Sequence, residues 1–216
     1  MEIVRKIAAV KIVFKFYLLI LIVFFGTDTD AQNRPVATGS AAPFFKLKNI
    51  DNSFVSFNDY PTAKGFILIF ISNVCPYSKA YEQRILDLDK KYARLQFPVI
   101  ALNSNDPSIS PGDSFEKMRE RSKTRHYTFP YLCDEQQQVA DLYGASNTPQ
   151  VFIVSKRDTG YAVEYTGAID NDTPNKNPGK IKYAEDAVDA LLNNKKPVIT
   201  ATKAISCSIT RKRKQQ

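Results

Sequence analysis

The residues best suited to chemistry are Cys75 and its neighbours, in the segment Ser72-Asn-Val-Cys-Pro-Tyr-Ser78. An unbroken apolar run, residues 66–71, precedes this segment, and an amphipathic stretch follows it. That order predicts a strand that ends just before Cys75 and a helix that begins just after it. The dipole at a helix N-terminus stabilises a thiolate, so a cysteine there loses its proton more readily than a free thiol. Cys75 is therefore the candidate nucleophile.

Position 78 holds a serine, at the place where a Cys-x-x-Cys redox motif carries its second cysteine. Ser78 can donate a hydrogen bond to a Cys75 thiolate, but it cannot resolve a mixed disulfide. After Cys75 attacks a disulfide, release therefore requires a second thiol in the chain or an external thiol. The expected partners are protein thiols or disulfides, or an external thiol reductant.

Two further cysteines, Cys133 and Cys207, stand far from Cys75 in the sequence. Cys133 ends a predicted strand, on the sheet edge where Cys75 is also expected, so it is either a resolving thiol or a small buried residue. Cys207 follows the last predicted helix. A mobile tail suits a resolving cysteine, because the entropy cost of closing a loop grows only slowly with its length. Both possibilities stay open.

Metal chemistry is not expected from these residues. The three cysteines are widely spaced, and His126 is the only histidine, which is not the clustered ligand pattern of a metal site. His126 lies at the basic end of a predicted helix and is expected to face solvent. No metal or organic cofactor is therefore predicted.

Alternating strand and helix patterns surround these residues. A hairpin is followed by apolar runs typical of buried strands, and the segments between them show helical spacing of apolar residues. From Pro76, the apolar residues predict a helix of about 18 residues. The order predicts an α/β sandwich with a partly parallel sheet. The hairpin spans 44–57, the strands 65–71, 97–102, 129–132, 150–154 and 161–166, and the further helices 114–125, 135–143 and 181–193.

The N-terminal segment, residues 1–31, has the pattern of an export signal. It has a basic start, a short apolar core over residues 16–25, and small residues at Thr29-Asp-Ala31 where cleavage would occur. The mature chain is then expected in an extracytoplasmic, periplasmic compartment, with an uncleaved membrane anchor as the alternative. We assign residues 32–42 to a linker, 43–196 to one domain and 197–216 to a basic tail.

The formal net charge of +8 is partly local, because Arg211-Lys-Arg-Lys214 lies in this tail. A solvated tail is the expectation, since no aromatic residues interleave with the charges. Export removes nucleic acid as a partner. Membrane contact is expected only through the signal segment or the tail.

The chain resembles the thioredoxin superfamily, in its redoxin branch near the alkyl hydroperoxide reductase/thiol-specific antioxidant proteins and the exported thiol–disulfide oxidoreductases. The resemblance covers most of residues 40–195 and implies a three-layer α/β sandwich, with a mostly parallel mixed sheet, an N-terminal hairpin and helices on both faces. The stretches that carry it are Ala42-Pro-Phe-Phe45, Cys75-Pro-Tyr-Ser78, Phe129-Pro-Tyr-Leu-Cys-Asp134, Val139-Ala140, Tyr143-Gly-Ala145 and Thr148-Pro-Gln-Val-Phe152.

The resemblance also implies roles for residues beside Cys75. Pro149 matches the cis proline that packs against the reactive cysteine, which leaves the backbone of Thr148 free to pair with an extended peptide substrate. Pro76 and Tyr77 are then expected to contact substrate. Cys207 lies in Ile205-Ser-Cys-Ser-Ile209, which resembles a terminal Gly-Cys-x-Ile motif in relatives of this branch. This motif makes Cys207 a candidate partner of Cys75.

Peroxide-reducing relatives place a threonine, a proline and an arginine around the reactive cysteine, where Ser72, Leu68 and Pro149 stand here. Serine can replace threonine as a hydroxyl donor, but neither leucine nor proline can do the other two tasks. The leading hypothesis is therefore an exported redoxin that performs thiol–disulfide exchange through Cys75. The alternatives are a thiol peroxidase with Ser72 assisting, and a non-catalytic module that binds extended peptides beside Pro149.

Overall fold

The computed structural model describes residues 36–212, and the statements that follow concern this range. The export signal predicted for residues 1–31 lies outside the described residues. Between residues 36 and 212, no helix combines the length and the apolar character needed to cross a bilayer.

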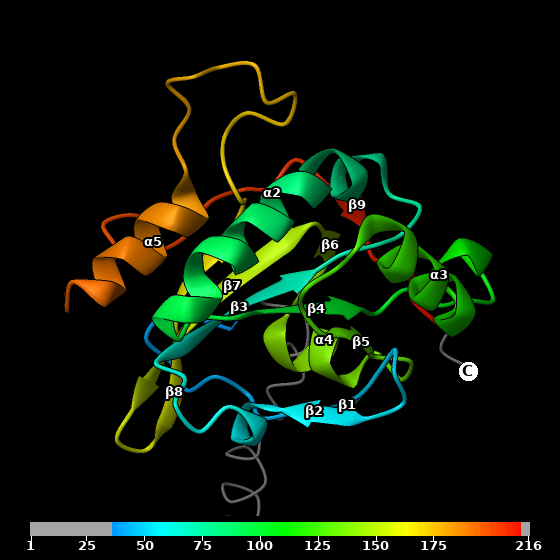
Figure 1. Ribbon diagram of the computed structural model, residues 1–216, viewed down its shortest axis with the longest axis horizontal. Coiled ribbons are helices and arrows are strands. Elements are labelled where there is room, and N and C mark those ends of the chain that lie inside the picture. The colour runs from blue at the N-terminus through cyan, green and yellow to red at the C-terminus, as the bar shows by residue number, and fades with distance from the viewer. Residues whose placement is uncertain (1–35, 213–216) are drawn as a thin grey trace, which may run out of the picture. The chain divides into compact units, whose positions relative to one another are not determined.

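A seven-stranded mixed sheet forms the centre of this unit, in the order β2-β1-β5-β4-β3-β7-β8 (Figure 1). The three central strands, β5, β4 and β3, are parallel, and the remaining pairings are antiparallel. Parallel pairing is thus confined to the centre and does not extend over most of the sheet, because two hairpins form its edges. The strands are β1 (Lys46–Asn49), β2 (Phe54–Ser56), β3 (Gly65–Phe70), β4 (Val99–Asn103), β5 (Tyr131–Cys133), β7 (Gln150–Arg157) and β8 (Gly160–Gly167).

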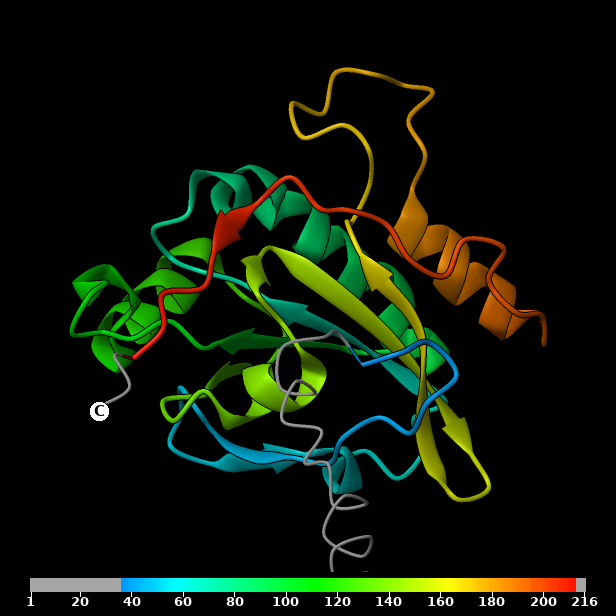
Figure 2. The same ribbon diagram turned by 180° about the vertical axis from the view of Figure 1, so that it is seen from behind.

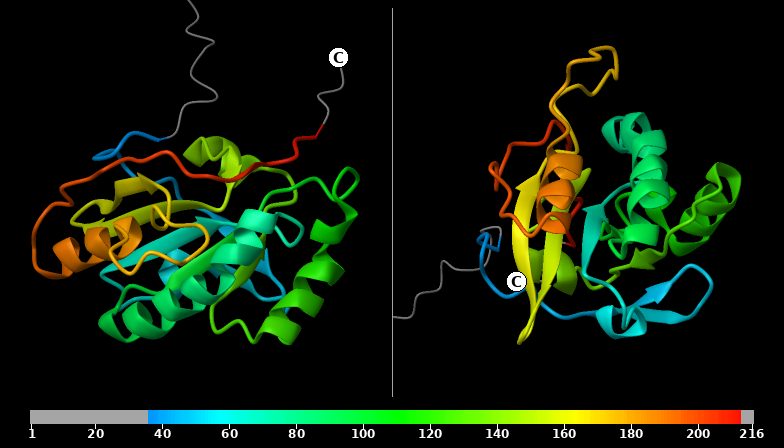
Figure 3. Two further views of the ribbon diagram at one scale, coloured as in Figure 1. Left: turned by 90° about the horizontal axis from the view of Figure 1, so that it is seen from above. Right: turned by 60° about the vertical axis from the view of Figure 1, so that its left-hand side comes forward.

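Helices cover both faces of the sheet, as the sequence predicts (Figure 1 and Figure 3). Side chains of α2 (Pro76–Tyr92), α3 (Phe115–Arg125) and α5 (Tyr183–Leu192) join one apolar cluster with alternate strand residues. Those of α4 (Gln138–Tyr143) join a second cluster on the opposite face. Every residue of β3 is buried, because a strand covered on both faces has no solvent side.

Helix α2 begins as predicted, with Pro76 in its first turn, and extends for 17 residues. Proline is tolerated there because the first N–H groups of a helix have no intrahelical partner. Tyr81, Ile85, Leu88 and Tyr92 bury the apolar stripe. Leu95 lies beyond the helix in a short 3-10 turn and is 41% exposed.

Both ends of the described range pack onto the domain, which changes the predicted boundaries. On the N-terminal side, the N–H of Val36 donates to Tyr143 and the N–H of Ala42 donates to Tyr161, so the predicted linker is docked. On the C-terminal side, the chain returns from α5 across the sheet toward the start of α2 (Figure 2). There β9 (Cys207–Ser208) pairs with β6 (Asn147–Thr148) in a second, two-stranded sheet. Backbone pairing keeps this segment in place, where the sequence predicts a solvated tail.

Candidate functional site

Cys75 lies at the junction between β3 and α2. It is the N-cap residue of α2, and its side chain is only 3% exposed. Around it, Val74 and Pro76 are exposed and Tyr77 is partly exposed. The Cys75 sulfur therefore lies at the positive end of the α2 dipole, on a residue that solvent scarcely reaches.

A disulfide joins Cys75 to Cys207 across 132 positions of sequence, with the two Cα atoms 6.0 Å apart. The strand pairing explains how such distant residues meet. In the antiparallel β6–β9 pair, Cys207 lies opposite Thr148 and Ser208 lies opposite Asn147. Of the two candidate partners for Cys75, the structure brings Cys207 to it.

The peptide bond between Thr148 and Pro149 is cis, as the resemblance implies. The carbonyl oxygen of Thr148 lies 3.1 Å from the sulfur of Cys75. In the disulfide this sulfur carries no hydrogen, whereas a reduced thiol could donate to the same oxygen. The resemblance implies that the backbone of Thr148 is free to pair with a peptide substrate. In the structure Cys207 occupies that position, because β9 pairs with β6.

Ser72 lies beside Cys75, but its hydroxyl donates its hydrogen bond to Asp113 and not to the cysteine sulfur. Its Oγ donates to Asp113 Oδ2 at 2.8 Å and accepts the N–H groups of Val74 and Cys75, each at 3.2 Å. The backbone N–H of Ser72 donates to Ser78 Oγ at 3.2 Å. Both serines therefore hold the backbone of the junction, and Ser78, at 5% exposure, is a buried support for it.

The carboxylate of Asp113 organises this junction, although sequence analysis does not single it out. It is 3% exposed and accepts four hydrogen bonds. The donors besides Ser72 are the Asn73 N–H at 2.6 Å, Asn103 Nδ2 at 2.9 Å and Ser110 Oγ at 2.7 Å. Four bonds fill the acceptor capacity of a carboxylate. The available signal was an Asp in a Pro-Gly-Asp turn, soon after a strand that ends on the same sheet edge as β3.

Tyr131 completes the buried network on the far side of the junction. Its hydroxyl donates to Asn73 Oδ1 at 3.0 Å and accepts from Asn103 Nδ2 at 3.0 Å. Asn73 Nδ2 in turn donates to the Gly112 carbonyl at 2.9 Å. Strands β4 and β5 thus hold the loop before Cys75 through side chains, which fixes where the helix begins.

Cys133 is a free thiol and is not joined to Cys75. It ends β5 opposite Lys48 of β1, and it packs against the apolar cluster beneath α2. Burial raises the pKa of the Cys133 thiol to about 11. Because the thiolate is the nucleophile in disulfide exchange, a thiol that stays protonated at neutral pH is a poor resolving group.

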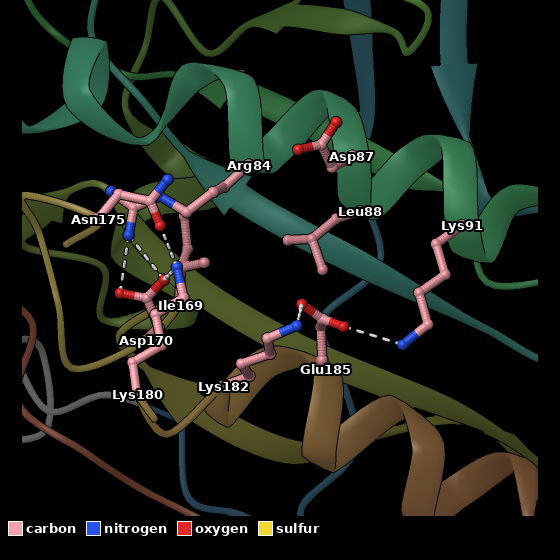
Figure 4. Close-up of a pocket in the computed structure, with 10 residues that line it drawn as sticks. All are labelled: Arg84, Asp87, Leu88, Lys91, Ile169, Asp170, Asn175, Lys180, Lys182 and Glu185. Atoms are coloured by element: carbon pink, nitrogen blue, oxygen red, sulfur yellow. Dashed lines mark hydrogen bonds and ion pairs between the residues drawn. The ribbon is translucent and has the colours of Figure 1, made fainter. Parts of the chain in front are cut away.

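A separate cavity of about 330 Å³ lies between α2, α5 and the loop before α5 (Figure 4). Its charges are largely paired: Arg84 binds both carboxylate oxygens of Asp170, and Lys91 contacts Glu185 at 2.9 Å. No cysteine lines this cavity, so it is separate from the thiol site. Over residues 36–212, no group of three His, Cys, Asp or Glu side chains is placed to hold a metal ion. His126 caps α3 and faces solvent, as predicted.

Replacing Asp113 tests the buried network. Asp113→Ala leaves four donors without their acceptor, so we expect the free energy of unfolding to fall by about 3 kcal/mol or more. Asp158→Ala, in the exposed turn between β7 and β8, is the control, with an expected change within about 0.5 kcal/mol. Urea denaturation of both variants measures the difference. Equal stabilities would show that Asp113 does not organise the junction.

The pH dependence of alkylation tests the state of Cys133. Since burial raises its pKa to about 11, we expect slow labelling by iodoacetamide at pH 7 and a rate that rises with pH up to about that value. Mass spectrometry of native protein in which Cys75 and Cys207 remain disulfide-bonded isolates this thiol. A labelling rate that is already at its plateau at pH 8 would contradict the burial argument.

Comparison with known proteins places the chain in a family. It is similar to the thiol–disulfide oxidoreductase ResA of Geobacillus kaustophilus, with 29% identity over 143 residues, which is 64% of this chain and 78% of ResA. A solved hypothetical protein from Sinorhizobium meliloti matches with a TM-score of 0.75 and 29% identity, over 84% of this chain and 98% of its own. An uncharacterised protein from G. kaustophilus matches with a TM-score of 0.74 and 33% identity, over 84% and 95%.

The match to a family model covers the N-terminal hairpin, the Cys75 junction, the cis proline and β7. It extends over residues 38–160, more than half of the chain, and the model describes the AhpC/TSA family. The sheet order and the flanking helices are those of a thioredoxin-like fold. This protein belongs to the AhpC/TSA family.

Proposed function

We propose that this protein is an extracytoplasmic thiol–disulfide oxidoreductase whose redox pair is Cys75 and Cys207. The observation that carries this proposal is the disulfide between these two cysteines, at the N-terminus of α2 and beside cis-Pro149. A disulfide accepts two electrons without metal or cofactor and becomes a dithiol, and external thiols supply those electrons by exchange.

Cys207 supplies the second thiol that Ser78 cannot. The sequence predicts a single nucleophile, Cys75, whose release requires another thiol. With Cys207 bonded to it, the pair needs no cysteine one helical turn after Cys75. The substrates are thiols and disulfides, by analogy with the ResA relative.

A dedicated peroxidase is the less favoured function. Peroxide reduction needs hydrogen-bond donors that stabilise the leaving oxygen. Ser72 commits its hydroxyl hydrogen to the Asp113 carboxylate. Leu68 is fully buried within β3, and Pro149 has no backbone N–H. None of the three positions offers a donor to a peroxide.

A module that binds extended peptides along Thr148 is also less favoured. An added strand needs an open backbone edge. Here β9 already pairs with β6, and a covalent bond holds it there. A peptide can use this edge only after the protein's own strand leaves.

Extracytoplasmic location supports the redox role. Disulfides persist in oxidising compartments, and reducing systems remove them in the cytosol. The basic, apolar and small-residue pattern of residues 1–31 is that of a signal for export. We therefore place the exchange reaction outside the cytoplasm.

Redox titration with peptide mapping tests the proposed function. In glutathione buffers of increasing oxidised fraction, we expect one reversible disulfide that joins Cys75 to Cys207. Cys207→Ser should abolish it, whereas Cys133→Ser should retain it, because the free Cys133 thiol is no part of the pair.

Two results would overturn this function. The first is a disulfide that remains closed at every glutathione potential used, which would make it a structural crosslink. The second is rapid conversion of reduced Cys75 to sulfenic acid by dilute peroxide, trapped with dimedone, together with rapid turnover of peroxide, which would favour the peroxidase.

A further inference from the structure

The C-terminal arch, residues 201–212, is fixed at both ends independently of its disulfide. At the first end, the N–H of Thr202 donates to the Thr166 carbonyl at 3.0 Å, and its hydroxyl accepts the Ala168 N–H at 2.9 Å. Gly167 lies between them with φ 144, and a Cβ there would collide with the backbone of Thr202. The close approach at this end therefore depends on glycine.

The second end is held by an apolar side chain and by backbone hydrogen bonds. Ile209 is 5% exposed within the cluster beneath α4, and its N–H donates to Ser146 at 2.8 Å. The N–H of Thr210 donates to Asn105 Oδ1 at 2.8 Å, and its carbonyl accepts Gln137 Nε2 at 2.8 Å. No sulfur takes part in either anchor, so neither set of contacts includes the disulfide itself.

Between the anchors, the two cysteine residues differ in exposure. Cys75 is 3% exposed, whereas Cys207 is partly exposed and is followed by the exposed Ser208. Ile205, two residues earlier, is 61% exposed. A hollow of about 450 Å³, bordered by Asn147 and Gln150, lies along the first half of the arch. Because Cys207 itself is partly exposed, an external thiol can approach it from solvent, whereas the domain covers Cys75.

We infer that an external thiol enters the oxidised protein at Cys207, and that the anchored arch keeps Cys207 beside Cys75 after reduction. This inference rests on the proposed function and deepens it. It reverses the assignment made from the sequence, in which Cys75 meets the partner directly. Cys75 exchanges only with Cys207, and Cys207 exchanges with the outside.

The electron transfer has two steps. A thiolate of the partner attacks Sγ of Cys207, so a partner–Cys207 disulfide forms, the Cys75–Cys207 bond breaks, and Cys75 leaves with the electron pair as a thiolate. A second partner thiolate then attacks the partner sulfur of the mixed disulfide, and Cys207 leaves as a thiolate. The partner becomes a disulfide, and the protein gains two electrons and takes two protons from solvent.

The arch also limits the class of partner. Since β9 occupies the backbone edge at Thr148 and stays anchored, a polypeptide cannot add itself there as a strand. The partner that fits is a low-molecular-weight thiol, whose single sulfur needs only the exposed side of Cys207.

Adduct mapping tests the point of entry. The oxidised full chain is mixed with excess glutathione and quenched with acid at successive early times, and the glutathionylated peptides are quantified. At the shortest times we expect adducts on Cys207 to outnumber those on Cys75 by about tenfold or more, because attack requires access to the sulfur. In the same chain unfolded in guanidinium chloride, the two adducts should form in about equal amounts.

The outcomes separate this inference from the proposed function. Adducts that begin on Cys75 in the folded protein, or in equal amounts on both cysteines, overturn the inference and leave the redox pair intact. A disulfide that glutathione does not open at all overturns the proposed function and the inference with it.

A matched pair of isoleucines tests the anchoring. In a Cys207→Ser background, which has no disulfide between arch and helix, we expect iodoacetamide to label Cys75 at least about tenfold more slowly than in the unfolded chain. Adding Ile209→Ser, which removes the buried anchor, should speed labelling about tenfold to a hundredfold, as expected from the burial energy of one isoleucine. Ile205→Ser, the exposed control, should leave the rate unchanged.

Circular dichroism checks that each variant is folded. Equal labelling rates in the Ile209→Ser and Ile205→Ser variants would show that the arch is not anchored through Ile209. If Ile209→Ser does not fold, the labelling rate of Cys75 in the Cys207→Ser protein is the deciding measurement. Fast labelling overturns the anchoring, and slow labelling supports it.

Discussion

The arrangement of the site depends on one buried carboxylate. Asp113 gathers donors from the loop before Cys75, from the end of β4 and from its own turn, and no other described group touches all three. A buried carboxylate is stable only when its lone pairs are used, so the three segments must come together for the charge to be tolerated. Through Ser72 and Asn73, that requirement fixes the backbone from which α2 begins, and with it the position of the Cys75 sulfur.

The second requirement is a partner for the backbone of β6. Two residues beside a cis proline form too short a strand to stand alone, and Thr148 is almost fully buried. The partner strand is β9, from the C-terminal part of the same chain, and not a substrate. One pairing therefore covers a polar edge and delivers a second cysteine to the first. The helix keeps Ser78 at the position where many redox proteins carry that cysteine, and Ser78 is left to hold the backbone of Ser72.

The sequence predicted most of the fold because apolar periodicity and breaker residues mark its elements strongly. The continuous run of β3, the stripe of α2 and the Pro76 start all follow from local rules, and the Cys75 junction follows with them. The roles of Ser72 and of the tail could not be predicted in the same way. Whether a serine hydroxyl faces a sulfur or a carboxylate depends on Asp113, 41 residues away.

Docking of the tail is likewise a tertiary effect. Residues 203–212 are polar and basic on average, and local composition indicates solvation. They pack because Ile209 is buried in an apolar cluster. In addition, the backbone of Thr210 forms hydrogen bonds with the side chains of Asn105 and Gln137. In the sequence, only the resemblance of the terminal motif and the low entropy cost of closing a long loop indicate Cys207 as a partner of Cys75.

The separation of 132 positions between the two redox cysteines has a thermodynamic consequence. In a Cys-x-x-Cys motif, one helical turn holds both sulfurs, so no remote segment has to dock before the disulfide can form. Here the sulfurs meet only while a remote segment is docked, so the equilibrium for closing the disulfide contains the equilibrium for docking as a factor. Denaturant, temperature or a ligand that loosens the segment must then make the protein a stronger oxidant, and by linkage its oxidation must tighten the docked segment. The protein's redox potential and the local stability of its C-terminus are one coupled property.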